Sequence, residues 1–151
     1  DVARLLEHLM SVASRTGVPE VRTGPRASAI RAARVCYDHL AGEAAVQMFA
    51  SFERRKFFRY ADEGVGLSKR GVDHFDAFGI DTAALSQHRR ALCRTCLDWS
   101  ERRHHLAGAL GAALLDRFFE LGWVRRVRNS RVVTFSALGE MELRRQFGVG
   151  E

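Results

Sequence analysis

A phrase that occurs twice is the feature that most restricts how this chain can fold. The tetrapeptide His-Leu-Ala-Gly stands at residues 39–42 and again at 105–108, an offset of 66 residues. Cys36 and Cys96, which precede the two copies, are 60 residues apart, so the second copy carries six additional residues. Later landmarks keep offsets of 68 and 69: Gly71 with Gly139, and Phe78-Gly79 with Phe147-Gly148. The near-constant spacing indicates an internal duplication.

Hydrophobic spacing predicts the same order of elements in both copies. In the first copy we expect helices over 28–42 and 44–56, a hairpin over 57–68 and a closing helix over 69–78, followed by a short helix over 82–90 that Asp81 caps. In the second copy we expect helices near 97–103 and over 106–121, a hairpin over 123–135 and a last helix to residue 147 that Ser136 caps. The order of helix, helix, hairpin and helix is that of a winged helix. The predicted fold class is therefore mainly α with two short β-hairpins, built as tandem winged-helix-like repeats behind a dimerisation helix.

The first residues follow a pattern of their own. Apolar side chains recur at helical spacing from Val2 to Ala13, and both prolines of the chain lie in the segment 17–28 that follows. We divide the chain into an N-terminal helix and linker over 1–25, which we expect to contact a dimer partner, a first winged-helix-like unit over 26–92 and a second over 93–151. Because the helical pattern is already running at the first residue, we expect a preceding segment to have been removed.

Composition narrows the class of protein. The 151 residues are 46% hydrophobic, which is enough for a packed core, and no apolar run approaches the length of a membrane span. Three cysteines are a poor basis for a disulfide framework, so a reducing cytoplasm is the expected location. No nucleophile motif or phosphate-binding glycine loop is present, so we expect no enzyme activity. The net charge of +6 permits an acidic partner such as nucleic acid, and an ordinary solvated surface explains it equally well.

Two long segments carry a family resemblance. "RAARVCYDHLAG" and "CRTCLDWSERRHHLAGALGAALLDRFFELGWVRR" resemble the C-terminal region of a long subgroup of ArsR-type helix-turn-helix transcriptional regulators, and the resemblance runs from about Arg26 to the C-terminus. It implies a homodimer whose DNA-binding domain precedes this region, so that the chain keeps the effector part. The family often has Thr-Pro-x-Gly before the helix that closes each unit, and here Leu67-Ser68-Lys69-Arg70-Gly71 and Phe135-Ser136-Ala137-Leu138-Gly139 replace it. A serine cap can begin a helix without the proline.

Cysteine and histidine spacing points to a metal ion. Cys36-x-x-His39 and Cys93-x-x-Cys96 are each spaced for two ligands of one tetrahedral ion. If the two units pack face to face, these four residues form a Cys₃His set suited to Zn²⁺ or another thiophilic ion, and Asp38 and Asp98 can orient a histidine ligand. Two alternatives stay open: the cysteines are small buried hydrophobes, or Cys93 and Cys96 form a redox pair.

A small-molecule effector is the other possibility for a sensor. Aromatic side chains of the two units can line a cavity, and Trp99, His105 and Asp38 are the candidate ligand-binding residues because they lie in or beside the repeated phrase. The competing interpretation is that the aromatic residues fill two small cores.

Arginines gather on the second predicted hairpin and suggest DNA contact. A basic wing of this kind can bind phosphates, and its candidate residues are Arg125, Arg126, Arg128 and Arg131. The helix before it offers no Arg, Asn or Gln on its outer face to read bases. We therefore predict the effector-sensing and dimerisation region of an ArsR-type regulator, responding to a metal ion or small ligand. The alternatives are a winged-helix protein that binds DNA through its basic hairpin, or a cysteine-based redox sensor.

Overall fold

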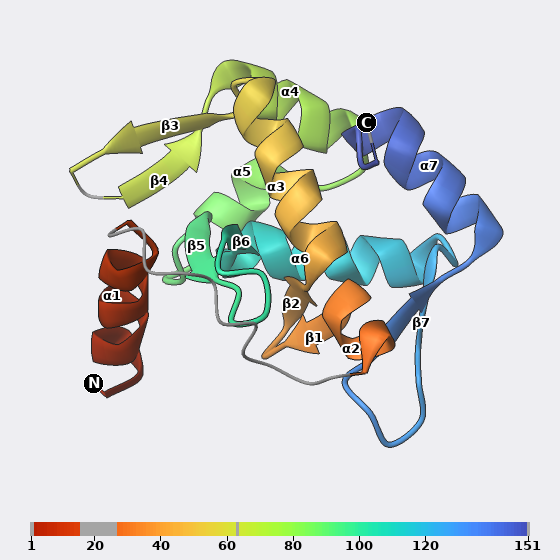
Figure 1. The fold of residues 1–151 in the computed structure, drawn as a ribbon. Helices are drawn as coiled ribbons and strands as arrows, with labels where there is room; N and C mark the ends of the chain where they lie inside the picture. Colours follow the sequence, from red (N-terminus) through yellow and green to blue (C-terminus); the bar gives the residue numbers. More distant parts are fainter. Residues whose placement is uncertain (1, 16–26, 63, 151) are drawn as a thin grey trace.

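A computed structural model describes residues 2–15, 27–62 and 64–150 (Figure 1). Its helices are α1 Val2–Arg15, α2 Ser28–Ala32, α3 Glu43–Arg54, α4 Lys69–Ala77, α5 Thr82–Ser86, α6 Gly108–Glu120 and α7 Ala137–Phe147. Its strands form four antiparallel pairs: β1 Arg34–Cys36 with β2 His39–Ala41, β3 Phe58–Ala61 with β4 Gly64–Leu67, β5 Arg94–Leu97 with β6 His104–Ala107, and β7 Val124–Arg126 with β8 Val133–Phe135. A mainly α fold with short hairpins is confirmed. None of the helices in the described ranges has the length and apolarity needed to cross a membrane.

The segment before α3 departs from the prediction. The expected helix over 28–42 ends at Ala32, and a tight hairpin follows in which Val35 pairs with Leu40 and Cys36 with His39. β-branched and aromatic residues favour strands, and Tyr37 takes a positive φ of 57° in the two-residue turn. The apolar side chains whose spacing suggests one face of a helix lie instead on β1 and β2, two strands of three residues each.

The same departure recurs in the second half. The helix expected near 97–103 is a loop that joins β5 to β6, because the Asp98 carboxylate accepts hydrogen bonds from the backbone N–H groups of Ser100 and Glu101. Such local side-chain bonds compete with helix formation. This loop contains the six additional residues of the second copy, since Cys96 pairs across the hairpin with His105 as Cys36 pairs with His39.

Both units therefore have the order hairpin, helix, hairpin, helix. Counting the short helix that precedes each first hairpin, the first unit runs from α2 to α4 and the second from α5 to α7. In each, Ser68 or Ser136 caps the closing helix by accepting a hydrogen bond from the glycine N–H three residues later, as the sequence predicts. The comparison with winged helices stays a prediction, because a hairpin stands where the first helix of each unit was expected.

The repeated His-Leu-Ala-Gly phrase has one structural meaning in both units. Its first three residues form the inner part of β2 or β6, and its glycine begins the next helix with a positive φ, 95° at Gly42 and 87° at Gly108. A Cβ at Gly42 would lie 2.6 Å from the Arg31 carbonyl oxygen, and one at Gly108 would lie 2.8 Å from that of Leu92. Only glycine fits this conformation and this close approach.

The two units interlock around one core. α3 of the first unit packs on β6 of the second, α6 of the second packs on β2 of the first, and β2 lies beside β6 (Figure 1). One hydrophobic cluster draws on both units, and its largest fully buried apolar side chains include Phe52, Phe75, Phe118 and Phe147. The aromatic residues thus fill a shared core instead of two small ones. Backbone hydrogen bonds from Val35 N to Arg131 O and from Val133 N to Ala33 O add a further link.

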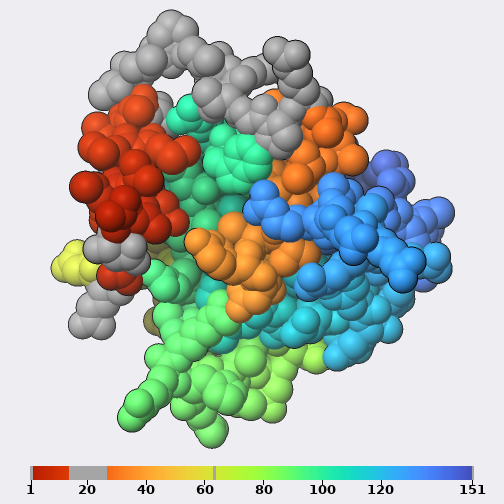
Figure 2. Space-filling model, turned by 90° about the horizontal axis from the view of Figure 1, so that it is seen from below, coloured from red at the N-terminus to blue at the C-terminus, as the bar shows by residue number. Residues whose placement is uncertain are grey.

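Helix α1 lies on one flank of the molecule, where it forms a ridge in Figure 2. Its polar residues Arg4, Glu7, His8 and Ser11 face a cavity that it shares with β5. Its large apolar residues point away and are 50–73% exposed: Val2, Leu5, Leu6, Leu9 and Val12. Of the predicted linker segment 17–28, residues 17–26 lie outside the described residues.

Candidate metal centre

Four metal-ligating side chains meet where β2 and β6 lie side by side. Cys36 and His39 come from the first hairpin, and Cys96 and His105 from the equivalent hairpin of the second unit. Their candidate ligand atoms all lie within 4.8 Å of one another. Both histidines are buried and both cysteines are half-buried. Because each unit contributes one cysteine and one histidine at equivalent positions, the cluster lies on the boundary between the units.

The two imidazoles point the same nitrogen at the cluster. The Nε2 atoms of His39 and His105 are 3.1 Å apart. The opposite nitrogens face carboxylates: His39 Nδ1 is 3.3 Å from Asp38 Oδ1, and His105 Nδ1 is 3.7 Å from Asp98 Oδ2. Metal-bound histidines in proteins almost always direct their second nitrogen to such a group, which fixes the ring and its tautomer. His105 Nδ1 is buried and has no hydrogen-bond partner among the residues that the structure describes.

The two thiols affect each other's ionisation. A hydrogen bond from Cys96 stabilises the thiolate of Cys36 and lowers the pKa of Cys36, and the nearby histidines act in the same direction. The same bond, together with burial, raises the pKa of Cys96. The pair therefore favours one thiolate and one thiol that share a proton. A cation bound between them would take the place of that proton.

A buried ion pair supports the second histidine. The Arg34 guanidinium donates to both carboxylate oxygens of Asp98 at 2.8 Å, and the two side chains are 1% and 0% exposed. Asp98 also accepts hydrogen bonds from Gly42 N at 2.7 Å and from the Ser100 hydroxyl at 2.8 Å. Burial opposes ionisation of Asp98, but the hydrogen bonds from Arg34, Gly42 and Ser100 outweigh it and lower the pKa of Asp98 to about 2. The carboxylate beside His105 is therefore anionic and fixed in place.

The donor set fits a tetrahedral thiophilic ion such as Zn²⁺. Two sulfur and two imidazole donors are a common set for structural zinc. With Zn–N bonds of about 2.0–2.1 Å, two nitrogens of a tetrahedral site are about 3.3 Å apart, close to the distance between the two Nε2 atoms. The buried His105 Nδ1, which faces a carboxylate and lacks a hydrogen bond, is consistent with a ring held for coordination through Nε2.

The sequence-based ligand set and this cluster share three residues. Cys36, His39 and Cys96 come together, whereas Cys93 lies in the hydrophobic core and is 4% exposed. Burial raises the pKa of the Cys93 thiol to about 12, so it is a poor ligand and a poor nucleophile there. His105, predicted as a ligand-binding residue, takes the fourth position. The repeat alignment contains the signal for it, because it pairs His39 with His105 and Cys36 with Cys96.

The other two candidate ligand-binding residues, Trp99 and Asp38, contact side chains that support the cluster or belong to it. Trp99 lies against Arg34, whose guanidinium carbon is 4.5 Å from the centre of the Trp99 ring. Asp38 is half-exposed and forms an ion pair with Arg90 beside its contact with His39. Trp99 and Asp38 therefore hold the arginine and the histidine next to them instead of lining an open pocket.

The predicted basic wing is exposed. Arg125, Arg126, Arg128 and Arg131 all belong to the hairpin of β7 and β8 or to its connecting loop, and all have exposed side chains. The Arg126 guanidinium carbon lies 5.4 Å from the centre of the Phe119 ring. The helix before the hairpin, α6, is largely buried against β2, which leaves it little surface for a base contact.

Comparison with known proteins finds a significant similarity to a curated relative. The chain is 35% identical over 149 residues, or 99% of its length, to a protein of Bacillus subtilis (strain 168) named as an HTH-type transcriptional regulator, YdfF. The chain spans 66% of the length of that relative. No protein-family model matches the chain, and neither does any solved structure. The similarity supports a transcriptional regulator, and it does not distinguish the ArsR subgroup.

Proposed function

We propose that this chain is the effector region of an ArsR-type transcriptional regulator and that Cys36, His39, Cys96 and His105 bind Zn²⁺ or a related thiophilic ion. The observation that carries the proposal is the meeting of four such side chains, one cysteine and one histidine from each unit, within 4.8 Å. The relative named as an HTH-type regulator supports the regulatory role. The chain spans 66% of that relative. Following the family resemblance, we place DNA recognition in a domain of the full-length protein that precedes these residues.

The ligands give metal binding a direct structural consequence. The ion supplies positive charge in place of the proton shared by Cys36 and Cys96, and its bonds to the two Nε2 atoms need only a small change in their 3.1 Å separation. Because each hairpin contributes two ligands, binding joins the two units at β2 and β6. Asp38 and Asp98 hold the rings from the far side. A ligand that binds one arrangement of the units more tightly shifts the population toward it, and this is how the occupied site would influence an attached DNA-binding domain.

Helix α1 is the proposed dimer contact. Val2, Leu5, Leu9 and Val12 follow the alternating three- and four-residue spacing of a coiled-coil seam, and all are at least half exposed. A second copy of α1 would cover this stripe while the polar face stays toward β5. Sedimentation of the purified chain tests the contact: Leu5→Glu together with Leu9→Glu should convert a dimer into a monomer, whereas Glu7→Gln on the polar face should not. A monomeric parent chain would contradict it.

Metal content tests the site. The purified chain, stripped with chelator and reloaded with Zn²⁺, should hold one equivalent by elemental analysis. Co²⁺ in place of Zn²⁺ should give an intense thiolate-to-metal absorption. Cys36→Ser and Cys96→Ser should each weaken binding at least tenfold, since each removes a thiolate ligand. Cys93→Ser is the matched control and should keep the full equivalent, because its sulfur lies in the core. Equal metal content in the parent chain and the Cys36→Ser, Cys96→Ser double variant would refute the site.

A redox sensor is the second candidate function. The positions of the thiols favour a different cysteine pair from the one that the sequence suggests. Cys36 and Cys96 share the cluster, so they are the pair to test instead of Cys93 and Cys96. In that reaction the two thiols lose two electrons and two protons to a peroxide, which is reduced to water, and a disulfide forms. Thiol counting after mild peroxide treatment should show a loss of two thiols in the parent chain and in Cys93→Ser. Unchanged thiol content would exclude this candidate.

A further inference from the structure

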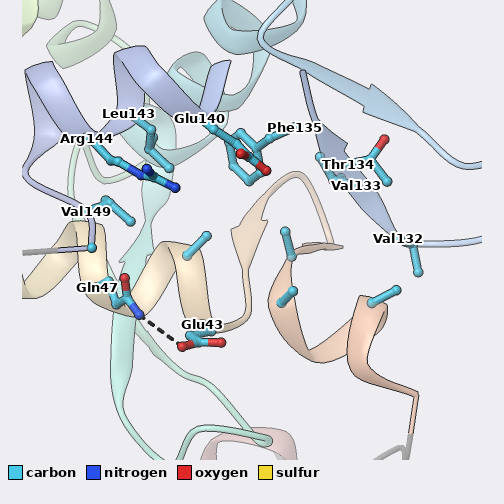
Figure 3. A pocket seen from close by; sticks show the side chains of 15 residues that line it. Glu43, Gln47, Val132, Val133, Thr134, Phe135, Glu140, Leu143, Arg144 and Val149 are labelled. Atoms are coloured by element: carbon cyan, nitrogen blue, oxygen red, sulfur yellow. Dashed lines mark hydrogen bonds between the residues drawn. The ribbon is translucent and has the colours of Figure 1, made fainter. Parts of the chain in front are cut away.

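A cleft of about 570 Å³ lies between α2, α3, β8 and α7, which are on the opposite side of the molecule from α1 in Figure 1, and Figure 3 shows it from close by. The first unit supplies one wall, from α2 and the start of α3, and the second unit supplies the other, from β8, α7 and the residues after α7. The buried side chains at its base are apolar: Ala33, Val133, Leu143 and Val149. Its volume and apolar base are those of a small-molecule site.

The duplication explains why this space is open. In the second unit the short helix α5 precedes the hairpin and contacts both α4 and α6. It reaches α4 because only a few residues connect them in the chain, from Phe78 to Asp81. The equivalent helix of the first unit is α2, which contacts α3 and β8, and no such connection draws it toward α7. Small side chains on α2 and α3, those of Ala29, Ala32 and Ala44, keep the space free.

The charged side chains at the mouth of the cleft carry more negative than positive charge. Glu43 of α3 and Glu140 of α7 stand on opposite walls, and Arg144 lies one turn beyond Glu140 (Figure 3). Glu43 accepts a hydrogen bond from the Gln47 amide at 3.0 Å. Within the described part of the chain, the side chains of Glu140 and Arg144 form no ion pair or hydrogen bond. Two carboxylates and one guanidinium leave the mouth with a net charge of about −1, although the whole chain carries +6.

We propose that this cleft binds a small organic cation that has an aromatic or aliphatic body. The apolar base takes the body, and the Phe135 ring at the wall adds a surface on which a cation is favourable. The carboxylates of Glu140 and Glu43 face the charged group from opposite walls. Arg144 opposes the cation, so its removal strengthens binding while removal of Glu140 weakens it. The site is separate from the Cys-His cluster and does not depend on the metal.

Calorimetric titration of the 151-residue chain with three probes tests the proposal. 1-Naphthylmethylammonium, 1-naphthylmethanol and 1-naphthaleneacetate share one aromatic body and differ in charge. We expect saturable binding of the cation, weaker binding of the alcohol and the weakest binding of the anion. Glu140→Gln should weaken cation binding about fivefold and Arg144→Gln should strengthen it by a similar factor, as is usual for single partly exposed charges. Asp116→Asn, which removes an exposed carboxylate on α6, is the matched control and should change nothing.

A filled cleft provides the independent check. Ala32→Phe places a large ring in the space from an exposed position of α2, so it should abolish binding while the circular dichroism spectrum and the unfolding midpoint stay those of the parent chain. Three results would each overturn the proposal: no saturable binding of any naphthyl probe, binding of the anion at least as tight as that of the cation, or equal effects of Glu140→Gln and Asp116→Asn.

Discussion

Replacement of Arg34 by methionine should remove a large part of the protein's free energy of unfolding. The change keeps an unbranched apolar side chain and removes the guanidinium, which leaves the Asp98 carboxylate, 0% exposed, without its arginine. Breaking a buried pair in this way costs about 3–5 kcal/mol. Asp98 keeps its bonds from Gly42 N, from Ser100 and from Glu101 N, so we expect a loss near the lower end, about 3 kcal/mol. That is a large fraction of the free energy of unfolding of an ordinary domain.

The double variant separates a specific pair from general damage. In Arg34→Met with Asp98→Asn no charge is buried, and the amide oxygen of the asparagine can still accept from Ser100 N and Glu101 N, which share one oxygen of Asp98, while the bond from Gly42 N to the other oxygen is lost. We therefore expect the double variant to lose about 1–2 kcal/mol, which is about 1–2 kcal/mol less than Arg34→Met alone. Trp99, which stacks on Arg34, and the buried Trp123 report unfolding by fluorescence during urea titration in the presence of chelator. Additive losses, or a loss below about 1 kcal/mol for Arg34→Met, would refute this reasoning.

Three further predictions concern single residues. Burial, with Arg55 nearby, lowers the pKa of His74 to about 4. Between pH 6.5 and 4 the unfolded chain therefore binds a proton at this histidine and the folded chain does not, so the free energy of unfolding should fall by about 2–3 kcal/mol over that range. Denaturant titrations of His74→Phe should show a smaller decrease. Ser136→Ala removes the cap of α7 and should cost about 1 kcal/mol, measured from the shift in the urea midpoint. Gly42→Ala should cost more than about 2 kcal/mol in the same titration, because it combines a positive φ with a clash against backbone, whereas Gly64→Ala, with open space around its Cβ, should cost about 1 kcal/mol.

Long elements were predictable from the sequence because their patterns are long. The apolar spacing and the serine caps correctly place four helices, α3, α4, α6 and α7. They also place the hairpin of β3 and β4. α6 is the clearest case, since 13 residues give several turns over which a helical period can be recognised. Strands β1 and β2, of three residues each, give no such period, whereas the β-branched residues of β8 allowed the equally short hairpin of β7 and β8 to be predicted.

The repeated hairpins were missed for a physical reason. In residues 30–41 the apolar side chains fall at positions that suit one face of a helix, and only tertiary packing of β2 against α6 and β6 decides for strands. Tyr37 shows the difference most plainly: a helix would place it on the apolar face, whereas in the turn it is 90% exposed. The repeat was more informative than the local pattern, because equivalent residues of two interlocked units come together at their boundary.

The distribution of partners across that boundary predicts how the molecule unfolds. The four candidate metal ligands are divided equally between the units, and the buried ion pair joins Arg34 of the first unit to Asp98 of the second. The loop that contains the six additional residues of the second copy supplies Asp98, Trp99 and Ser100, all of which contact Arg34. Neither unit alone can satisfy these groups or cover its face of the shared core, so residues 27–150 should unfold in one cooperative step despite the duplication. Calorimetry tests this: the ratio of calorimetric to van't Hoff enthalpy should be close to one for the metal-free chain, and two resolved transitions would show that each unit is stable without the other.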